Sequence, residues 1–130
     1  MPAEAAVLRL VKAEFRRSLG RRAGARSIIR LSDGPPVNFC KPAVDPMFDT
    51  VAQIYRRNAL ALVLTGMGSD GARGAGLIAD AGGSVIVQDE ETSVVWGMPG
   101  ATASAGNASE VLPLQAIGPK VIAMLARRRG

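Results

Sequence analysis

The clearest pattern in the chain is an uninterrupted apolar run that ends in a cluster of glycines. Residues 60–65 show no polar alternation, which is typical of a strand buried on both faces of a parallel sheet. The glycines of residues 66–71 indicate a tight turn, and residues 72–79 then repeat apolar side chains at helical spacing. Ser84–Gln88 predicts a second buried strand. These elements form a βαβ unit, in which ligands and reacting groups gather at the carboxyl ends of the strands.

Further helices and strands are predicted on both sides of this unit. Short strands are expected at Ser27–Leu31 and Glu110–Leu112. Helices are expected over residues 3–19, 45–58 (with Asp45 as N-cap and Pro46 in the first turn), 93–96, 99–105 and 114–128. The predicted fold class is α/β, with a doubly wound and mostly parallel sheet. We expect residues 1–26 to be an amphipathic, basic leader and residues 27–130 to form the α/β part.

Composition narrows the class of protein. A chain of 130 residues with 48% apolar residues fits one domain with a real core. No apolar run approaches the roughly 20 residues that cross a bilayer, and no signal peptide is evident. The single cysteine, Cys40, excludes an internal disulfide and fits a cytoplasmic location. The chain has no histidine, which excludes a Ser-His-Asp or Cys-His site built from this chain alone.

The net charge of +5 comes from basic clusters near the two ends of the chain. Such clusters can bind nucleic acid. Here a single aromatic residue, Phe15, lies among the basic residues, and no nucleic-acid recognition motif is present. We therefore interpret the clusters as solvated surface and expect neither nucleic-acid binding nor membrane insertion.

The glycine turn also fits a dinucleotide-binding pattern. Gly66, Gly68 and Gly71 satisfy G-x-G-x-x-G between a strand and a helix, and Asp89 ends the next strand, where a ribose ligand would lie. Asp70 argues against this function, because a carboxylate inside the loop would repel a pyrophosphate bound at the helix N-terminus. Dinucleotide binding is therefore kept only as a less favoured alternative.

Two interpretations of Asp70 remain open on the residues alone. It could simply cap the helix that follows, in which case Asp70→Asn should change stability by less than about 1 kcal/mol. It could instead be a functional carboxylate, because it lies among glycines at the carboxyl end of a parallel strand.

Several segments in order resemble the protein-glutamate methylesterase family of chemotaxis (CheB-type). These are Pro42–Phe48 (PAVDPMF), Leu64–Gly71 (LTGMGSDG), Gln88–Val95 (QDEETSVV) and Gly97–Pro99 (GMP). The resemblance runs from about residue 27 to residue 117. It implies a doubly wound catalytic domain that hydrolyses glutamate methyl esters on chemoreceptors, and in some members also deamidates glutamines.

The resemblance also implies a serine-histidine-aspartate triad. Asp70 matches the aspartate of that triad, which orients the histidine and stabilises the imidazolium. Met67 matches the residue whose backbone N–H contributes to the oxyanion hole. No cofactor and no metal are implied, and the partner is a methylated chemoreceptor.

The chain departs from the family in one large respect. The motifs that carry the family's serine and histidine do not occur, so the chain resembles the C-terminal half of a catalytic domain. We expect the chain alone to be inactive, and a non-catalytic docking or binding remnant is the alternative. A sheet that lacks the strands of the missing half exposes an unpaired edge. We therefore also expect self-association beside Ser27–Leu31 or Leu60–Thr65.

Overall fold

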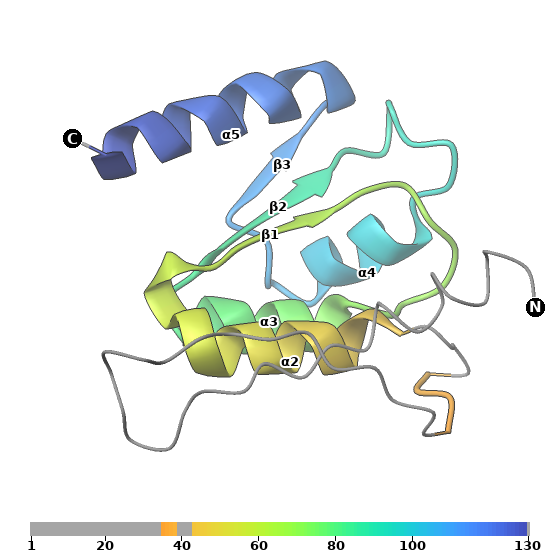
Figure 1. Ribbon diagram of the computed structural model, residues 1–130. Coiled ribbons are helices and arrows are strands. Elements are labelled where there is room, and N and C mark those ends of the chain that lie inside the picture. The colour runs from red at the N-terminus through yellow and green to blue at the C-terminus, as the bar shows by residue number, and fades with distance from the viewer. Residues whose placement is uncertain (1–34, 39–42, 130) are drawn as a thin grey trace, which may run out of the picture.

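A computed structural model describes residues 35–38 and 43–129. In this part of the chain three parallel strands form one sheet in the order β1-β2-β3, with bounds Leu60–Val63, Ser84–Gln88 and Glu110–Leu112. The helices are α2 (Val44–Tyr55), α3 (Ala72–Asp80), α4 (Gly97–Ser104) and α5 (Leu114–Arg129), and a 3-10 turn, Arg56–Asn58, follows α2 (Figure 1). The strand predicted at Ser27–Leu31 and the helix predicted over residues 3–19 lie outside the described residues.

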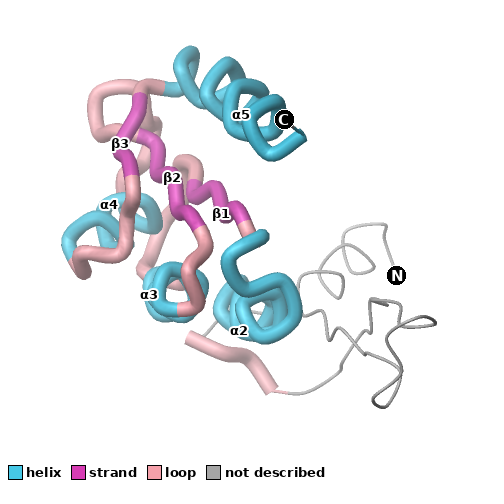
Figure 2. Tube along the Cα trace, turned by 90° about the vertical axis from the view of Figure 1, so that its left-hand side faces the viewer, coloured by secondary structure: helices cyan, strands magenta, loops and turns pink. Residues whose placement is uncertain are grey.

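The helices lie on both faces of the sheet. Figure 2 shows α3 and α4 on one face, with α2 beside α3, and α5 on the opposite face. The strands run parallel because helices connect them, and the first of these connections is the predicted βαβ unit from β1 through α3 to β2. The predicted doubly wound α/β class is confirmed.

The main hydrophobic core lies between the sheet and the pair α2 and α3. Apolar side chains fill it because both helices turn their apolar stripes inward and the strands turn alternate residues toward them. Its buried members are Phe48, Ala52, Ala59, Ala61, Val63, Ala75, Ile78, Val85 and Val87. The core holds the carboxyl ends of β1 and β2, where the candidate site lies.

Three expectations about local structure were wrong. Residues 60–65 are not buried on both faces, since Leu62 is 38% exposed within β1. No helix forms over residues 93–96, because that segment pairs with the end of β1 instead. Helix α4 begins at Gly97 rather than Pro99, because the residues before Pro99 already pack against the glycine turn.

Candidate functional site

The glycine turn between β1 and α3 is fixed by the segment that leads into α4. The Gly66 N–H donates to the Val95 carbonyl (2.9 Å), and the Met98 N–H donates to the Gly66 carbonyl (2.8 Å). A Cβ atom on Gly97 would lie 2.8 Å from both the Gly66 oxygen and the Gly68 nitrogen. Only glycine fits at position 97, which explains why the Gly-Met-Pro segment accompanies the turn.

Gln88 is a buried residue at the end of β2, and its hydrogen bonds connect three segments of the chain. Its side-chain oxygen accepts from the Thr65 N–H (2.9 Å), and its Nε2 donates to the Thr92 carbonyl (2.7 Å). Its own carbonyl accepts from the indole N–H of Trp96 (2.8 Å). These bonds explain the run of residues from Gln88 to Trp96 as a support for the turn.

The Asp89 carboxylate accepts hydrogen bonds from within the loop of residues 88–96. Its Oδ1 accepts from both the backbone N–H (3.0 Å) and the hydroxyl (2.6 Å) of Thr92. An aspartate engaged in this way is not placed as a free ligand for a ribose. This geometry removes one of the two features that suggested a dinucleotide site.

The Asp70 carboxylate is buried, with 5% of the residue exposed, and three donors surround it. Its Oδ2 accepts from the Val44 N–H at 2.5 Å, and its Oδ1 accepts from the Asp45 N–H at 3.2 Å and from Asn38 Nδ2 at 3.0 Å. Val44 and Asp45 are the first residues of α2. Asp70 therefore caps the N-terminus of α2 and not that of α3, whose N-cap is Gly71. Of the two interpretations of Asp70 that the sequence left open, the one in which it caps the helix that follows is wrong.

Asp45 makes the reciprocal interaction. Its Oδ1 accepts from the N–H groups of Gly71 (3.1 Å) and Gly74 (2.7 Å), at the N-terminus of α3. Asp45 was expected to be the N-cap of its own helix, but α2 begins one residue earlier and its N-cap is Ala43. The anion bound at the N-terminus of α3 is thus Asp45, and a pyrophosphate would have to displace it.

Asn38 joins the two carboxylates. Its Nδ2 donates to Asp45 Oδ2 (2.7 Å) and to Asp70 Oδ1 (3.0 Å). Two buried carboxylates repel one another, and the site compensates with the amide donor and with the positive ends of two helices. The sequence did not reveal this triplet because Asp70 lies 25 positions from Asp45 and 32 positions from Asn38. The Asp45-Pro46 pair was the only local signal, and it indicated a helix start.

The bonding leaves Asp70 able to accept one more hydrogen bond. An ionised carboxylate offers about four lone-pair positions. Among the described residues, Oδ1 accepts two bonds and Oδ2 accepts one, so no described donor occupies the second acceptor position of Oδ2. The geometry also revises the expected effect of Asp70→Asn. An asparagine presents N–H donors on one side of the group, where the carboxylate now accepts, so the expected cost rises to about 1–3 kcal/mol.

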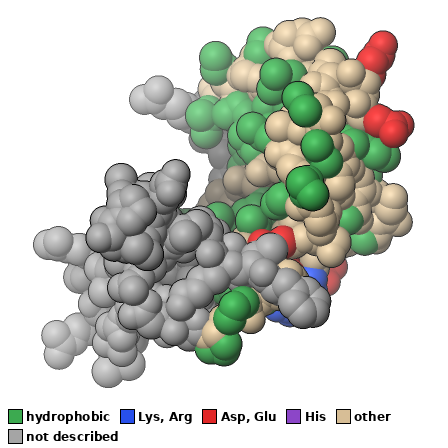
Figure 3. All heavy atoms as spheres, turned by 90° about the vertical axis from the view of Figure 1, so that its right-hand side faces the viewer, with side chains coloured by type: hydrophobic (Ala, Val, Ile, Leu, Met, Phe, Trp, Pro, Cys, Tyr) green, Lys and Arg blue, Asp and Glu red, His purple; other side chains and the backbone are tan. Residues whose placement is uncertain are grey.

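Met67 lies at the outer end of the turn and is 79% exposed. Within the described part of the chain, no hydrogen bond engages its backbone N–H. Leu64, Val94 and Val95 are exposed nearby in sequence and in the segments that pair with the turn. Figure 3 views this end of the molecule and shows apolar side chains gathered across it. The turn therefore presents a backbone donor within an apolar surface.

Residues 35–38 and 43–129 lack two further features, a metal-binding cluster and a membrane-spanning helix. No group of three or more His, Cys, Asp or Glu side chains there is arranged to hold a metal ion. None of the helices in this range has the length and apolar character needed to cross a membrane.

The structure defines the class of protein: an α/β protein with a buried aspartate at the carboxyl end of a parallel strand. Comparison with known proteins gives the particular family. The profile of the CheB methylesterase family matches residues 3–121, and the chain belongs to that family. The match begins inside the segment 1–26 that was expected to lie outside the family. A boundary at residue 26 stays a prediction.

Individual relatives agree with this assignment. A protein-glutamate methylesterase/protein-glutamine glutaminase of Rhodopseudomonas palustris (strain BisB5) is 58% identical over 108 residues, which are 83% of this chain and 28% of that protein. One of Nitrobacter hamburgensis is 57% identical over 105 residues, or 81% of this chain and 28% of that protein. The chain therefore spans little more than a quarter of the length of these curated relatives.

A solved structure shares the fold. The crystal structure of the Thermotoga maritima CheB methylesterase catalytic domain superposes with a TM-score of 0.76 at 36% identity. The alignment covers 87% of this chain and 58% of that domain. The fold of the described residues is thus that of part of a CheB catalytic domain.

Proposed function

We propose that this chain supplies the aspartate-bearing part of a catalytic domain that hydrolyses glutamate methyl esters on chemoreceptors and deamidates glutamines. The observation that carries the proposal is the Asp70 carboxylate, which is buried, fixed by three donors and left with one acceptor position on Oδ2. The names of the relatives support both activities. In this proposal the histidine comes from outside this sequence, which contains none, and the nucleophilic serine comes from a family motif that this sequence also lacks.

In this mechanism Asp70 Oδ2 accepts an N–H of the incoming imidazole and holds the ring in the tautomer that can remove the serine proton. The serine oxygen attacks the ester carbonyl, the imidazolium returns its proton to the leaving methanol, and water then hydrolyses the acyl-enzyme. Asp70 stabilises the imidazolium during both steps. The Met67 N–H, which has no hydrogen-bond partner among the described residues, stabilises the oxyanion in this proposal.

A non-catalytic docking module is the second candidate, and the absence of histidine favours it for the isolated chain. In that case the apolar surface around Met67 binds the receptor without chemistry. A dinucleotide site is the third and least favoured candidate, because Asp45 occupies the N-terminus of α3 and Asp89 is engaged by Thr92. The single cysteine, Cys40, supports a cytoplasmic location for each of the three.

The decisive comparison is between the chain alone and a hybrid enzyme. The hybrid consists of the R. palustris BisB5 relative with this chain in place of the part that it matches. Methanol release from a methylated chemoreceptor is measured for both proteins. We expect turnover by the hybrid and none above background by the chain, because a triad without nucleophile and base keeps only residual rate.

Two results would contradict the proposal. A folded hybrid that binds receptor but releases no methanol would favour the docking module. Methanol release by the isolated chain that is abolished by Asp70→Ala would show that the chain needs no outside residues. A titration of the chain with NAD is the control for the third candidate, and we expect no binding.

A further inference from the structure

Asp45 is a buried carboxylate that the mechanism above does not use. Only 2% of the residue is exposed, and three N–H donors satisfy its two oxygens. Burial of a charged group is costly unless each oxygen finds donors, so its position must serve the surrounding structure. Its donors identify what it serves, because two of them belong to the start of α3, directly after Asp70.

Asp45 and Asp70 hold one another through both backbone and side chain. The Asp45 N–H donates to Asp70 Oδ1, which fixes the orientation of the Asp70 carboxylate. In return, Asp45 Oδ1 accepts from the Gly71 N–H, which belongs to the peptide bond that follows Asp70. Asp45 therefore fixes the backbone from which the Asp70 side chain projects. Asn38 Nδ2 closes the arrangement by donating to both carboxylates.

Close packing leaves this arrangement no room to shift. A Cβ atom on Gly74 would lie 2.6 Å from Phe48 Cβ and 3.0 Å from Asp45 Oδ1, so α2 and α3 approach as closely as their backbones allow. Movement of α2 would break the bonds from Val44 and Asp45 to Asp70 together. The angle and position of the Asp70 carboxylate thus depend on where Asp45 holds the start of α2 against α3.

We propose that Asp45 is a positioning residue for Asp70, and that Asn38 assists it. The inference rests on the proposed function, in which Asp70 is the acid of a triad. A triad requires its groups within about 0.5 Å of the productive geometry, and a misplacement of about 1 Å can cost 10²-fold in rate. Asp45 contributes to catalysis through the placement of Asp70 and touches neither the substrate nor the histidine.

The test is a mutant cycle in the hybrid enzyme. Asp45→Asn keeps one oxygen to accept from Gly71 and Gly74, so both helix starts remain capped. Its new amide group then faces Asn38 Nδ2, donor against donor, and disturbs the joint between the two carboxylates. We expect kcat to fall by about 10–100-fold with KM unchanged within about twofold, as for a loss of transition-state placement.

The second half of the mutant cycle distinguishes a role of Asp45 in positioning Asp70 from a nonspecific effect on the folded structure. In an Asp70→Asn background, Asp45→Asn should cause no further fall in kcat, because the group that it positions is already lost. Asp49→Asn is the matched control. It makes the same charge change one turn further along α2, where the carboxylate accepts from Gln53 Nε2 at the surface, and its kcat should equal that of the unmodified hybrid.

The outcomes distinguish this inference from the proposed function. A normal kcat for Asp70→Asn would overturn the proposed function. An impaired Asp70→Asn with a normal Asp45→Asn, or with an equal Asp45→Asn effect in both backgrounds, would overturn the positioning role alone. If circular dichroism shows that Asp45→Asn does not fold, Asn38→Ala takes its place in the cycle. A smaller loss that vanishes in the Asp70→Asn background is then expected, and an additive loss would overturn the inference.

Discussion

The two faces of the sheet differ in how completely the chain covers them. On the face of α3 and α4, the side chains of Ile78, Val85 and Val87 are fully buried, and the joined aspartates fasten α2 to α3. On the face of α5, Ile86 and Ile117 are buried, but other large apolar side chains remain exposed. These exposed residues are Leu62 in β1, Leu64 just after it, and Leu114, Ile122 and Leu125 on α5.

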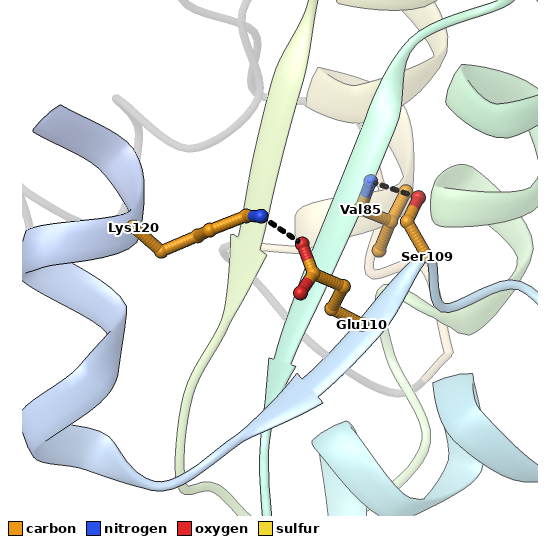
Figure 4. Close-up of polar contacts among 4 residues, drawn as sticks. All are labelled: Val85, Ser109, Glu110 and Lys120. Atoms are coloured by element: carbon orange, nitrogen blue, oxygen red, sulfur yellow. Dashed lines mark hydrogen bonds and ion pairs between the residues drawn. The ribbon is translucent and has the colours of Figure 1, made fainter. Parts of the chain in front are cut away.

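Helix α5 is attached by a small number of contacts. Figure 4 shows the ion pair between Lys120 Nζ and Glu110 Oε2 (2.9 Å), which joins α5 to β3. Both side chains are about one-third exposed, so this pair fixes orientation and adds little stability. The same view shows the Val85 N–H donating to Ser109 Oγ (2.9 Å), which holds the start of β3 to β2.

The difference indicates that the two faces have different roles, one holding Asp70 and the other forming an interface. On the face that carries Asp70, every buried side-chain nitrogen and oxygen of the described residues has a hydrogen-bond partner. The other face exposes apolar side chains next to the edge strand β1, a combination that marks an interface. We expect this face and edge to pack against further chain in the longer relatives and against a second copy in the isolated chain.

The largest expected effect is on the free energy of unfolding, when one large apolar residue is truncated on each face of the sheet. Ile78→Ala removes a side chain that is 1% exposed and leaves a cavity in the main core, so the free energy of unfolding should fall by about 3 kcal/mol. Leu62→Ala removes a side chain that is partly solvated, so the loss should stay below about 1 kcal/mol. Urea unfolding followed by circular dichroism gives both values. Equal losses would show that the α5 face is as well packed as the other.

A substitution at the edge strand β1 is expected to change the stability of the chain little but to reduce its self-association measurably. Leu62→Lys places a charge on the edge strand β1, a device that blocks pairing between edges, and should shift the chain toward monomer in sedimentation velocity. Its stability should change by less than about 0.5 kcal/mol. Val94→Lys introduces the same charge on a loop side chain that is almost fully exposed, and should leave association unchanged. A wild-type chain that is monomeric at high concentration would contradict the proposed self-association.

Sequence predicted the fold best where the pattern is local. The strands Ser84–Gln88 and Glu110–Leu112 have the predicted bounds, because short apolar runs between turn residues are specified by their own composition. The segment 93–96 was predicted wrongly because distant contacts decide it. The Thr65 hydroxyl exchanges hydrogen bonds with Val95, 30 residues away, and this pairing replaces the helix predicted over residues 93–96.

The residues of the candidate site likewise fall into those that a local motif identifies and those that only the fold brings together. Asp70 and Met67 could be selected from one contiguous motif at the end of a strand, and their roles stay predictions. The partnership of Asp70 with Asp45 and Asn38 could not be predicted, because it depends on the N-terminus of α2 lying beside that of α3. An aspartate before a helix normally indicates its own cap, and here two such residues each cap the helix of the other.

The central claim is that Asp70 is the aspartate of a catalytic triad, and the kcat of the Asp70→Asn hybrid enzyme tests this claim most directly. The measurement is made well below the unfolding temperature, since the substitution also weakens the cap of α2, and Asp49→Asn again serves as the charge-matched control. The account predicts a fall in kcat of about 10³–10⁴-fold, because an asparagine can hold the histidine in the wrong tautomer. A folded Asp70→Asn hybrid with a near-normal kcat would reduce Asp70 to a helix cap and contradict the account.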